Sequence, residues 1–135
     1  MQGLPKSLTA LAIVCAALAT ACQTTEPVAK YDGSAISQGY CASCHGASGA
    51  GDGPVAPSLA IAMQDLRGLQ SRNDGVFPRE RLQETIDGRG LRAAHGTADM
   101  PVWGWEFRRV EESEAQVQAR IDALIDYLEA IQISG

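Results

Sequence analysis

The sequence has few aromatic residues, few cysteines and no apolar run of comfortable transmembrane length. Aromatic side chains make up 5% of the 135 residues, and there are four cysteines. The apolar run from Leu8 to Ala21 is shorter than the about 20 residues that a transmembrane helix needs. A chain of this length has room for one domain. With so few aromatic side chains, that domain encloses little apolar core of its own.

Basic residues are outnumbered by acidic ones. The chain has 11 Lys and Arg against 16 Asp and Glu, a net charge of −5 at pH 7. A surface of this sign argues against nucleic acid and anionic lipid as partners. It would steer encounters with a basic patch on a protein partner, and salt would weaken that effect. An acidic surface that only keeps the protein in solution explains the same balance equally well.

The N-terminus has the pattern of a secretory signal peptide. Lys6 precedes the apolar run, which ends in the small residues Ala19-Thr20-Ala21. Cys22 follows directly, an arrangement that resembles the lipobox of bacterial lipoproteins, although Ala19 stands where leucine is most common. We favour lipidation of Cys22, which would tether the protein to the envelope membrane. Cleavage without lipidation, or an uncut N-terminal helix, stays open. The expected organisation is a signal peptide over 1–21, a polar tether over 22–30 and one domain over 31–135.

The patterns in the domain predict helices joined by glycine-rich loops. A first helix is expected to begin at Asp32 or Ser34 and to run to the cysteine pair. A short helix is expected from Pro78, with Gly88 at its end. Residues 88–106 are expected to be irregular. No segment alternates apolar and polar residues as a strand would, so the fold is predicted to be all-α.

The last helix has the clearest pattern. Ser113 and Gln116 fit a capping box at its start. Apolar residues then recur at steps of four and three, which places them on one face that would pack on a core. These residues are Val117, Ile121, Leu124, Leu128 and Ile131, and Arg120, Asp122, Asp126 and Glu129 are expected to face water.

Cys41-Ala42-Ser43-Cys44-His45 is the attachment signature of c-type haem. Two thiols at this spacing on a helical turn can each add to one haem vinyl group, and the adjacent imidazole can ligate the iron. A thioredoxin-like redox pair would be expected in an α/β context, and a zinc site needs a second pair of ligands. The other two cysteines lie in the processed segment, which suits an exported protein. One covalently bound haem c is therefore predicted, and it would supply the missing apolar core.

Together with this motif, two further segments resemble the class I cytochrome c family, especially its bacterial single-haem domains. They are the glycine-rich stretch from Gly49 to Leu59 and Met100-Pro101-Val102-Trp103. The resemblance implies three to five helices around one haem, with the first and last helices crossing. Many members carry an aromatic residue four positions before the first cysteine, where this chain has Ser37. The crossing is therefore expected to involve Gly33, Ile36 and Tyr127.

The resemblance also implies ligands and neighbours for the haem. Met100 is the implied second axial ligand of the iron, opposite His45, with His95 and Met63 as rivals. The carbonyl of Pro57 is the implied acceptor for the proton-bearing nitrogen of His45, with Pro54 as a rival. The candidates to pair with the haem propionates are Arg89, Arg92, Trp103 and Trp105.

These features predict an electron carrier in the bacterial periplasm rather than an enzyme. A haem with both axial positions filled has no open site for a substrate, so its expected partners are redox proteins. Two alternatives stay open. One is a haem subunit dedicated to a single oxidoreductase complex, and the other is a haem sensor or enzyme whose distal position is open.

Overall fold

A computed structural model describes residues 31–88 and 100–133. The predicted signal peptide, the tether with Cys22, and the candidates Arg89, Arg92 and His95 lie outside the described residues. The helices are α1 (Gly33–Tyr40), α2 (Ala42–His45), η2 (Ala56–Ser58), η3 (Leu66–Gly68), η4 (Ser71–Asn73), α3 (Arg79–Asp87), α4 (Trp103–Val110) and α5 (Glu114–Ala130). The described part of the chain contains no strand, and the all-α prediction is confirmed.

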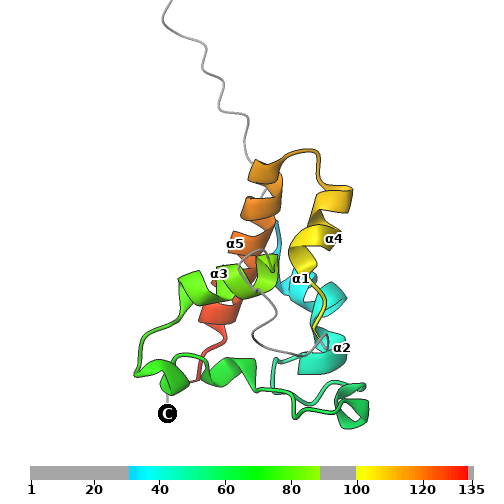
Figure 1. Ribbon diagram of the computed structural model, residues 1–135. Helices are drawn as coiled ribbons and strands as arrows, with labels where there is room; N and C mark the ends of the chain where they lie inside the picture. The colour runs from blue at the N-terminus through cyan, green and yellow to red at the C-terminus, as the bar shows by residue number, and fades with distance from the viewer. Residues whose placement is uncertain (1–30, 89–99, 134–135) are drawn as a thin grey trace, which may run out of the picture.

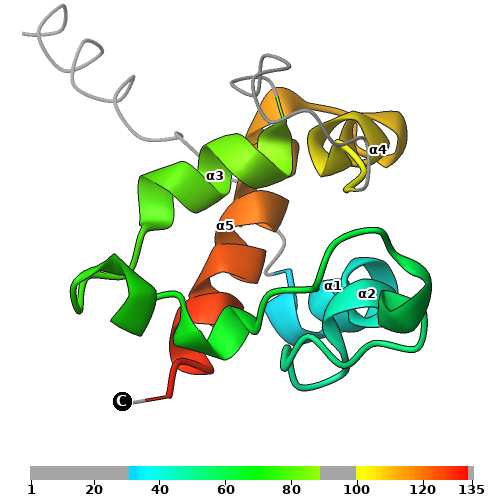
Figure 2. The ribbon, with the colours of Figure 1, turned by 60° about the horizontal axis from the view of Figure 1, so that its bottom comes forward.

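Helix α5 runs through the middle of the molecule, and α1, α3 and α4 pack against it (Figure 1). Its buried side chains include Val117, Ile121, Leu124 and Leu128, as its periodicity predicts, and Ile131 is half-buried. Phe107 from α4 and Ile86 from α3 complete the core. Viewed from below, α2 lies on one side of α5 and α3 lies on the other (Figure 2). None of the described helices is long and apolar enough to span a bilayer.

The first and last long helices cross at Gly33, in agreement with the expected crossing. Gly33 is buried, and a Cβ atom at this position would overlap the backbone carbonyl of Ala123 and press on the side chain of Tyr127. Ile36, one turn further along α1, joins the same core with 7% of its surface exposed. The absence of a side chain at one residue therefore sets how closely α1 approaches α5.

The expected helix ends are present. Asp32 caps α1 by accepting hydrogen bonds from the backbone N–H groups of Ser34 and Ala35, at 2.9 and 3.2 Å. The N–H of Gln116 donates to the Ser113 hydroxyl at the start of α5. Gly88 ends α3 with φ 71°, a left-handed conformation that glycine adopts without strain. Helix α3 begins at Arg79, one residue later than predicted.

Two predictions about the C-terminal half are wrong. Residues 103–110 form helix α4, although irregular chain was expected up to residue 106. The helix places Phe107 in the core, where it is fully buried. Arg120 does not face water. Its guanidinium lies 2.7 Å from the carboxylate of Glu111 and over the ring of Phe107, where it is largely covered.

Candidate cofactor site

A cavity of about 530 Å³ opens between α2, α3, the start of α4 and α5. Its volume lies within the range of about 300–1,000 Å³ that is typical of small-molecule sites. The walls are mainly apolar, with leucines and Ile86 supplied by α3 and α5. Five of the predicted site residues line this cavity: Cys41, Cys44, His45, Met100 and Trp103.

Helix α2 and the residue before it present the attachment motif to the cavity. Cys41 caps this single helical turn, and Cys44 and His45 lie on it. Both thiols are free and half-buried. Burial, followed by the nearby charge of Cys44, raises the pKa of the Cys41 thiol to about 11. The thiol is therefore neutral at pH 7, so the mainly apolar wall of the cavity carries no charge at this residue.

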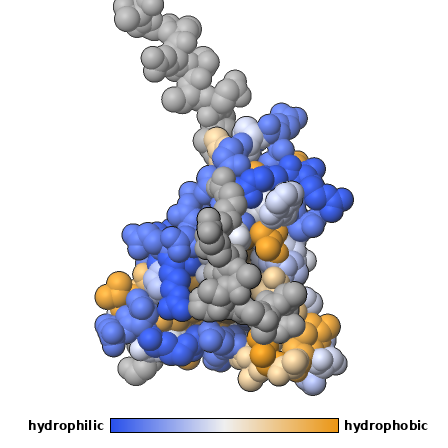
Figure 3. Space-filling model, in the orientation of Figure 1, coloured by the Kyte–Doolittle hydropathy of each residue, from blue (hydrophilic) through white to orange (hydrophobic). Residues whose placement is uncertain are grey.

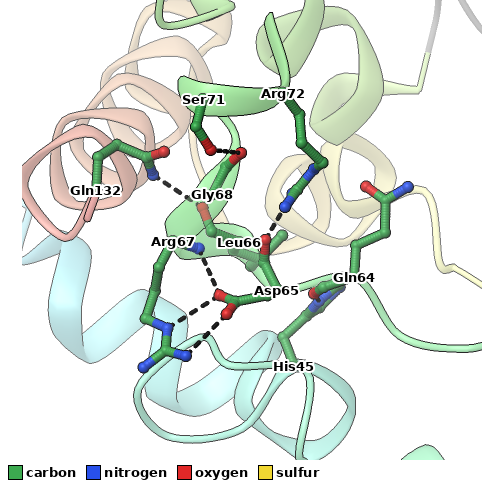
Figure 4. A network of polar contacts seen from close by, with 9 residues as sticks. All are labelled: His45, Gln64, Asp65, Leu66, Arg67, Gly68, Ser71, Arg72 and Gln132. Atoms are coloured by element: carbon green, nitrogen blue, oxygen red, sulfur yellow. Dashed lines mark hydrogen bonds and ion pairs between the residues drawn. The ribbon is translucent and has the colours of Figure 1, made fainter. Parts of the chain in front are cut away.

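His45 is oriented by the backbone carbonyl of another residue that lines the cavity. Its Nδ1 atom lies 3.2 Å from the carbonyl oxygen of Gln64 (Figure 4). A carbonyl oxygen only accepts hydrogen bonds, so Nδ1 carries the proton and donates it. The other ring nitrogen, Nε2, is then left with a free lone pair, the form of histidine that ligates a metal.

The acceptor is Gln64 and not Pro57, which corrects the prediction taken from the resemblance. Pro57 belongs to the exposed turn η2 and does not line the cavity. The chain then returns beneath His45, because Gly51 lets the backbone of residues 63 and 64 pass within contact distance. The N–H of Gly51 also donates to the carbonyl of His45 at 2.8 Å, which ties this part of the loop to the attachment motif.

Polar contacts on both sides brace the segment that holds the Gln64 carbonyl (Figure 4). The guanidinium of Arg67 pairs with Asp65 at 2.8 Å, and Arg72 donates to the Asp65 carbonyl at 2.6 Å. The hydrogen bonds from the side chain and backbone of Arg67 lower the pKa of Asp65 to about 2, so this carboxylate stays ionised at neutral pH. From just beyond the end of α5, the side-chain amide of Gln132 donates to the Leu66 carbonyl at 2.8 Å.

The structure brings two methionines to the cavity. Met100 lines it and is 41% exposed, and Met63 lines it from the returning loop. Both therefore remain sulfur donors within the site, whereas His95 lies outside the described residues. Trp103 lies beside Met100 and packs edge-to-face on Tyr40, with ring centroids 5.4 Å apart. Trp105 is 68% exposed and does not line the cavity, so its predicted pairing with a propionate is not supported.

Two cationic residues at the cavity were missed by the sequence analysis. Arg72, from η4, and Arg81, from the first turn of α3, both line it. The helices that carry them, η4 and α3, lie on the opposite side of α5 from α2 (Figure 2). A guanidinium suits a carboxylate, so Arg72 and Arg81 are residues that would hold the haem propionates. Their sequence context gives no signal beyond charge.

The donors at the cavity suit haem better than a bare metal ion. Two thiols, an imidazole with Nε2 available, thioether sulfurs and a mostly apolar wall match the chemistry of a covalently attached, six-coordinate haem. Within residues 31–88 and 100–133 there is no group of three or more His, Cys, Asp or Glu side chains placed to hold a metal ion.

The family model described as Cytochrome c matches residues 31–132, which include all the described helices. Comparisons with curated proteins and with solved structures gave no match.

Proposed function

Because the chain belongs to the cytochrome c family, and therefore binds covalently attached haem c and transfers electrons, we propose that it is a single-haem electron carrier whose iron is held by His45 and Met100. The observation that carries this proposal is that one cavity collects Cys41, Cys44 and His45 from α2 and Met100 from a distant part of the chain. Redox proteins are its proposed partners.

The residues of the site have separate tasks. Each cysteine thiol adds across one vinyl double bond, so that a sulfur–carbon bond forms, the thiol hydrogen goes to the neighbouring vinyl carbon and nothing leaves. Bound haem supplies one-electron exchange between ferric and ferrous iron. The Gln64 carbonyl orients His45 and raises its basicity. Arg72 and Arg81 would hold the propionates by charge-assisted hydrogen bonds.

An uncharged surface beside the attachment motif supports transfer to a protein partner. Residues 53–63 carry no charged side chain, and within them Val55 and Ile61 are 40% and 42% exposed. The N–H of Val55 donates to the carbonyl of Ser43 within the motif, so this surface adjoins the residues that would hold the haem. In Figure 3 the hydrophobic colour gathers at the lower right, over α2 and this loop. Small apolar surfaces of this kind suit brief, weak docking.

Replacement of the proposed axial methionine tests the function directly. In Met100→Ala, oxidised protein is expected to lose the weak far-red absorption band that a methionine sulfur gives on ferric haem. The reduction potential is expected to fall by a few tenths of a volt, within the span of about 0.8 V that axial ligands set. A redox titration followed by visible spectra measures both. Met63→Ala, which removes the other methionine that lines the cavity, is the matched control and is expected to keep the band.

Either of two results would count against the proposal. If the band survives in Met100→Ala and disappears in Met63→Ala, the ligand is Met63. If wild-type protein has no such band and binds cyanide at micromolar concentration, the distal position is open, as in the sensor or enzyme alternative.

For the location of the protein, we propose export and lipid anchoring through Cys22, supported by the signal-like residues before it. Cells grown with labelled palmitate are expected to yield labelled, membrane-bound wild-type protein. The Cys22→Ser variant is expected to carry no label, because serine offers no thiol for the anchor. Equal labelling of the two proteins would remove the proposal, and unlabelled wild-type protein in the periplasmic fraction would favour ordinary cleavage.

A further inference from the structure

The chain just beyond α5 is hydrogen-bonded to the segment that follows Gln64. The side chain of Gln132 makes three hydrogen bonds to backbone groups. Its Nε2 atom donates to the carbonyls of Leu66 and Leu128 at 2.8 and 2.7 Å, and its Oε1 atom accepts from the N–H of Gln70 at 2.9 Å. This one amide therefore joins the end of α5 to the start of η3 and to the chain that follows η3.

Leu66 is held through both of its backbone groups. Its carbonyl accepts from Gln132, and its N–H donates to the carbonyl of Gly49 at 2.7 Å. Gly49 belongs to the loop after the attachment motif, and a Cβ atom there would lie 3.1 Å from the side chain of Ile131. The end of α5 is thus in contact with both the loop after the motif and the segment that returns beneath His45.

The hydrogen bond that this segment gives to His45 tolerates little movement. The Gln64 carbonyl oxygen, two residues before Leu66, lies 3.2 Å from the Nδ1 atom of His45 (Figure 4). That distance is at the long end of the range of about 2.7–3.2 Å for such bonds, so a shift of a few tenths of an ångström would weaken it. Arg72 holds the neighbouring Asp65 carbonyl, but its side chain is exposed. Gln132 is half-buried, so its hydrogen bonds compete less with water.

We propose that Gln132 is a positioning residue for the axial histidine: by binding the Leu66 carbonyl, Gln132 keeps the Gln64 carbonyl within hydrogen-bond distance of His45. This inference rests on the proposed ligation of the iron by His45. Gln132 does not line the cavity and acts only through the segment. A hydrogen bond from Nδ1 raises the basicity of a ligating histidine, and a more basic ligand favours ferric iron. Loss of the Gln132 contacts would therefore favour the ferrous form.

Replacement of Gln132 by methionine in the holoprotein tests the inference, because methionine has a similar length and no N–H donor. The reduction equilibrium of Gln132→Met is expected to shift about threefold toward the ferrous form, a rise of about 30 mV at about 59 mV per tenfold. The Nδ1 proton of His45, followed by NMR of the reduced protein in heavy water, is expected to exchange about tenfold faster. The backbone N–H of Ile121, buried within α5, is expected to exchange as in wild type.

Gln118→Met is the matched control. Gln118 also lies on α5 and joins it to another helix, through a hydrogen bond of 2.9 Å from Gln83 of α3, but it does not contact residues 64–70. Its potential and its exchange at His45 are expected to match wild type. Gln132→Glu keeps the acceptor for Gln70 and loses both donors, so it is expected to behave as Gln132→Met does.

The outcomes separate this inference from the proposed function. If Gln132→Met has a lower urea midpoint but an unchanged potential and unchanged exchange at His45, Gln132 only stabilises the fold and the inference fails. If Gln132→Met does not accumulate, Gln132→Glu is measured instead, and unchanged values in that variant overturn the inference equally. If the ring of His45 has no paramagnetically shifted resonances in oxidised wild-type protein, His45 is not the ligand, and the proposed function fails with the inference.

Discussion

The double variant Cys41→Ser/Cys44→Ser is expected to contain no covalently bound haem. A serine hydroxyl does not add to a vinyl group under conditions in which a thiol does, so neither link forms. After denaturation and acid–acetone extraction, haem staining of the protein band is expected to be absent, whereas wild-type protein keeps its stain. Ser43→Ala, in the same turn and exposed, is the matched control and is expected to stain as wild type does.

The same variant is expected to lose most of its helical structure. Without haem, the mainly apolar walls of the cavity of about 530 Å³ would face water instead of the cofactor, so the apolar surface that haem covers would no longer be buried. A small domain is stable by only about 5–15 kcal/mol, so this loss of burial is expected to be large relative to its stability. Far-UV circular dichroism of the haem-free variant tests this. A fully helical haem-free protein would mean that the cavity collapses or fills with water at little cost.

The second large effect is expected at the helix crossing. In Gly33→Ala the new methyl group would overlap the carbonyl of Ala123, so α1 has to move away from α5. Overpacking of this kind typically costs about 1–3 kcal/mol, and here the obstacle is backbone that cannot rotate aside. The urea midpoint of the holoprotein is therefore expected to fall clearly below that of wild type.

Gly39→Ala provides a control in the same helix. A Cβ atom at Gly39 meets no atom within 4 Å, so the substitution adds no contact. It is expected to stabilise the protein by about 0.5–1 kcal/mol, because alanine loses less backbone freedom than glycine when a helix forms. If Gly33→Ala raises the midpoint as Gly39→Ala does, helix propensity outweighs the crossing, and the role assigned to Gly33 is wrong.

The helices that were predicted correctly are those whose caps and apolar faces can be recognised from residues close together in the sequence. Asp32 and Ser113 cap α1 and α5, and the apolar stripe of α5 matches its buried side chains. Helix α4 was missed because it has no side-chain cap and contains Gly104, which is unfavourable inside a helix. Packing explains why glycine occurs inside this helix, because a larger residue at position 104 would overlap Asp87 at the end of α3.

The site residues that act through a characteristic side chain were predicted from the sequence. Those that act through a backbone carbonyl, or that reach the cavity only through folding, were not. The attachment motif and Met100 were singled out from the sequence, and they line one cavity. The acceptor at His45 is the carbonyl of Gln64, and every residue has a carbonyl, so no residue type marks it. Arg72 and Arg81 reach the cavity only because η4 and α3 fold onto α5, and neither is distinguishable from a solvated charge beforehand.

The contact between Gln132 and Leu66 sets an order of events for a chain that is made from its N-terminus. The attachment motif is synthesised before Gln132, which braces the segment next to the Gln64 carbonyl from beyond the end of α5. Until α5 docks, that brace is missing and His45 is not held in its final orientation. Whatever joins haem to the newly made chain therefore meets two cysteines and a histidine on a short, unsupported segment, and rigidity at the iron comes last.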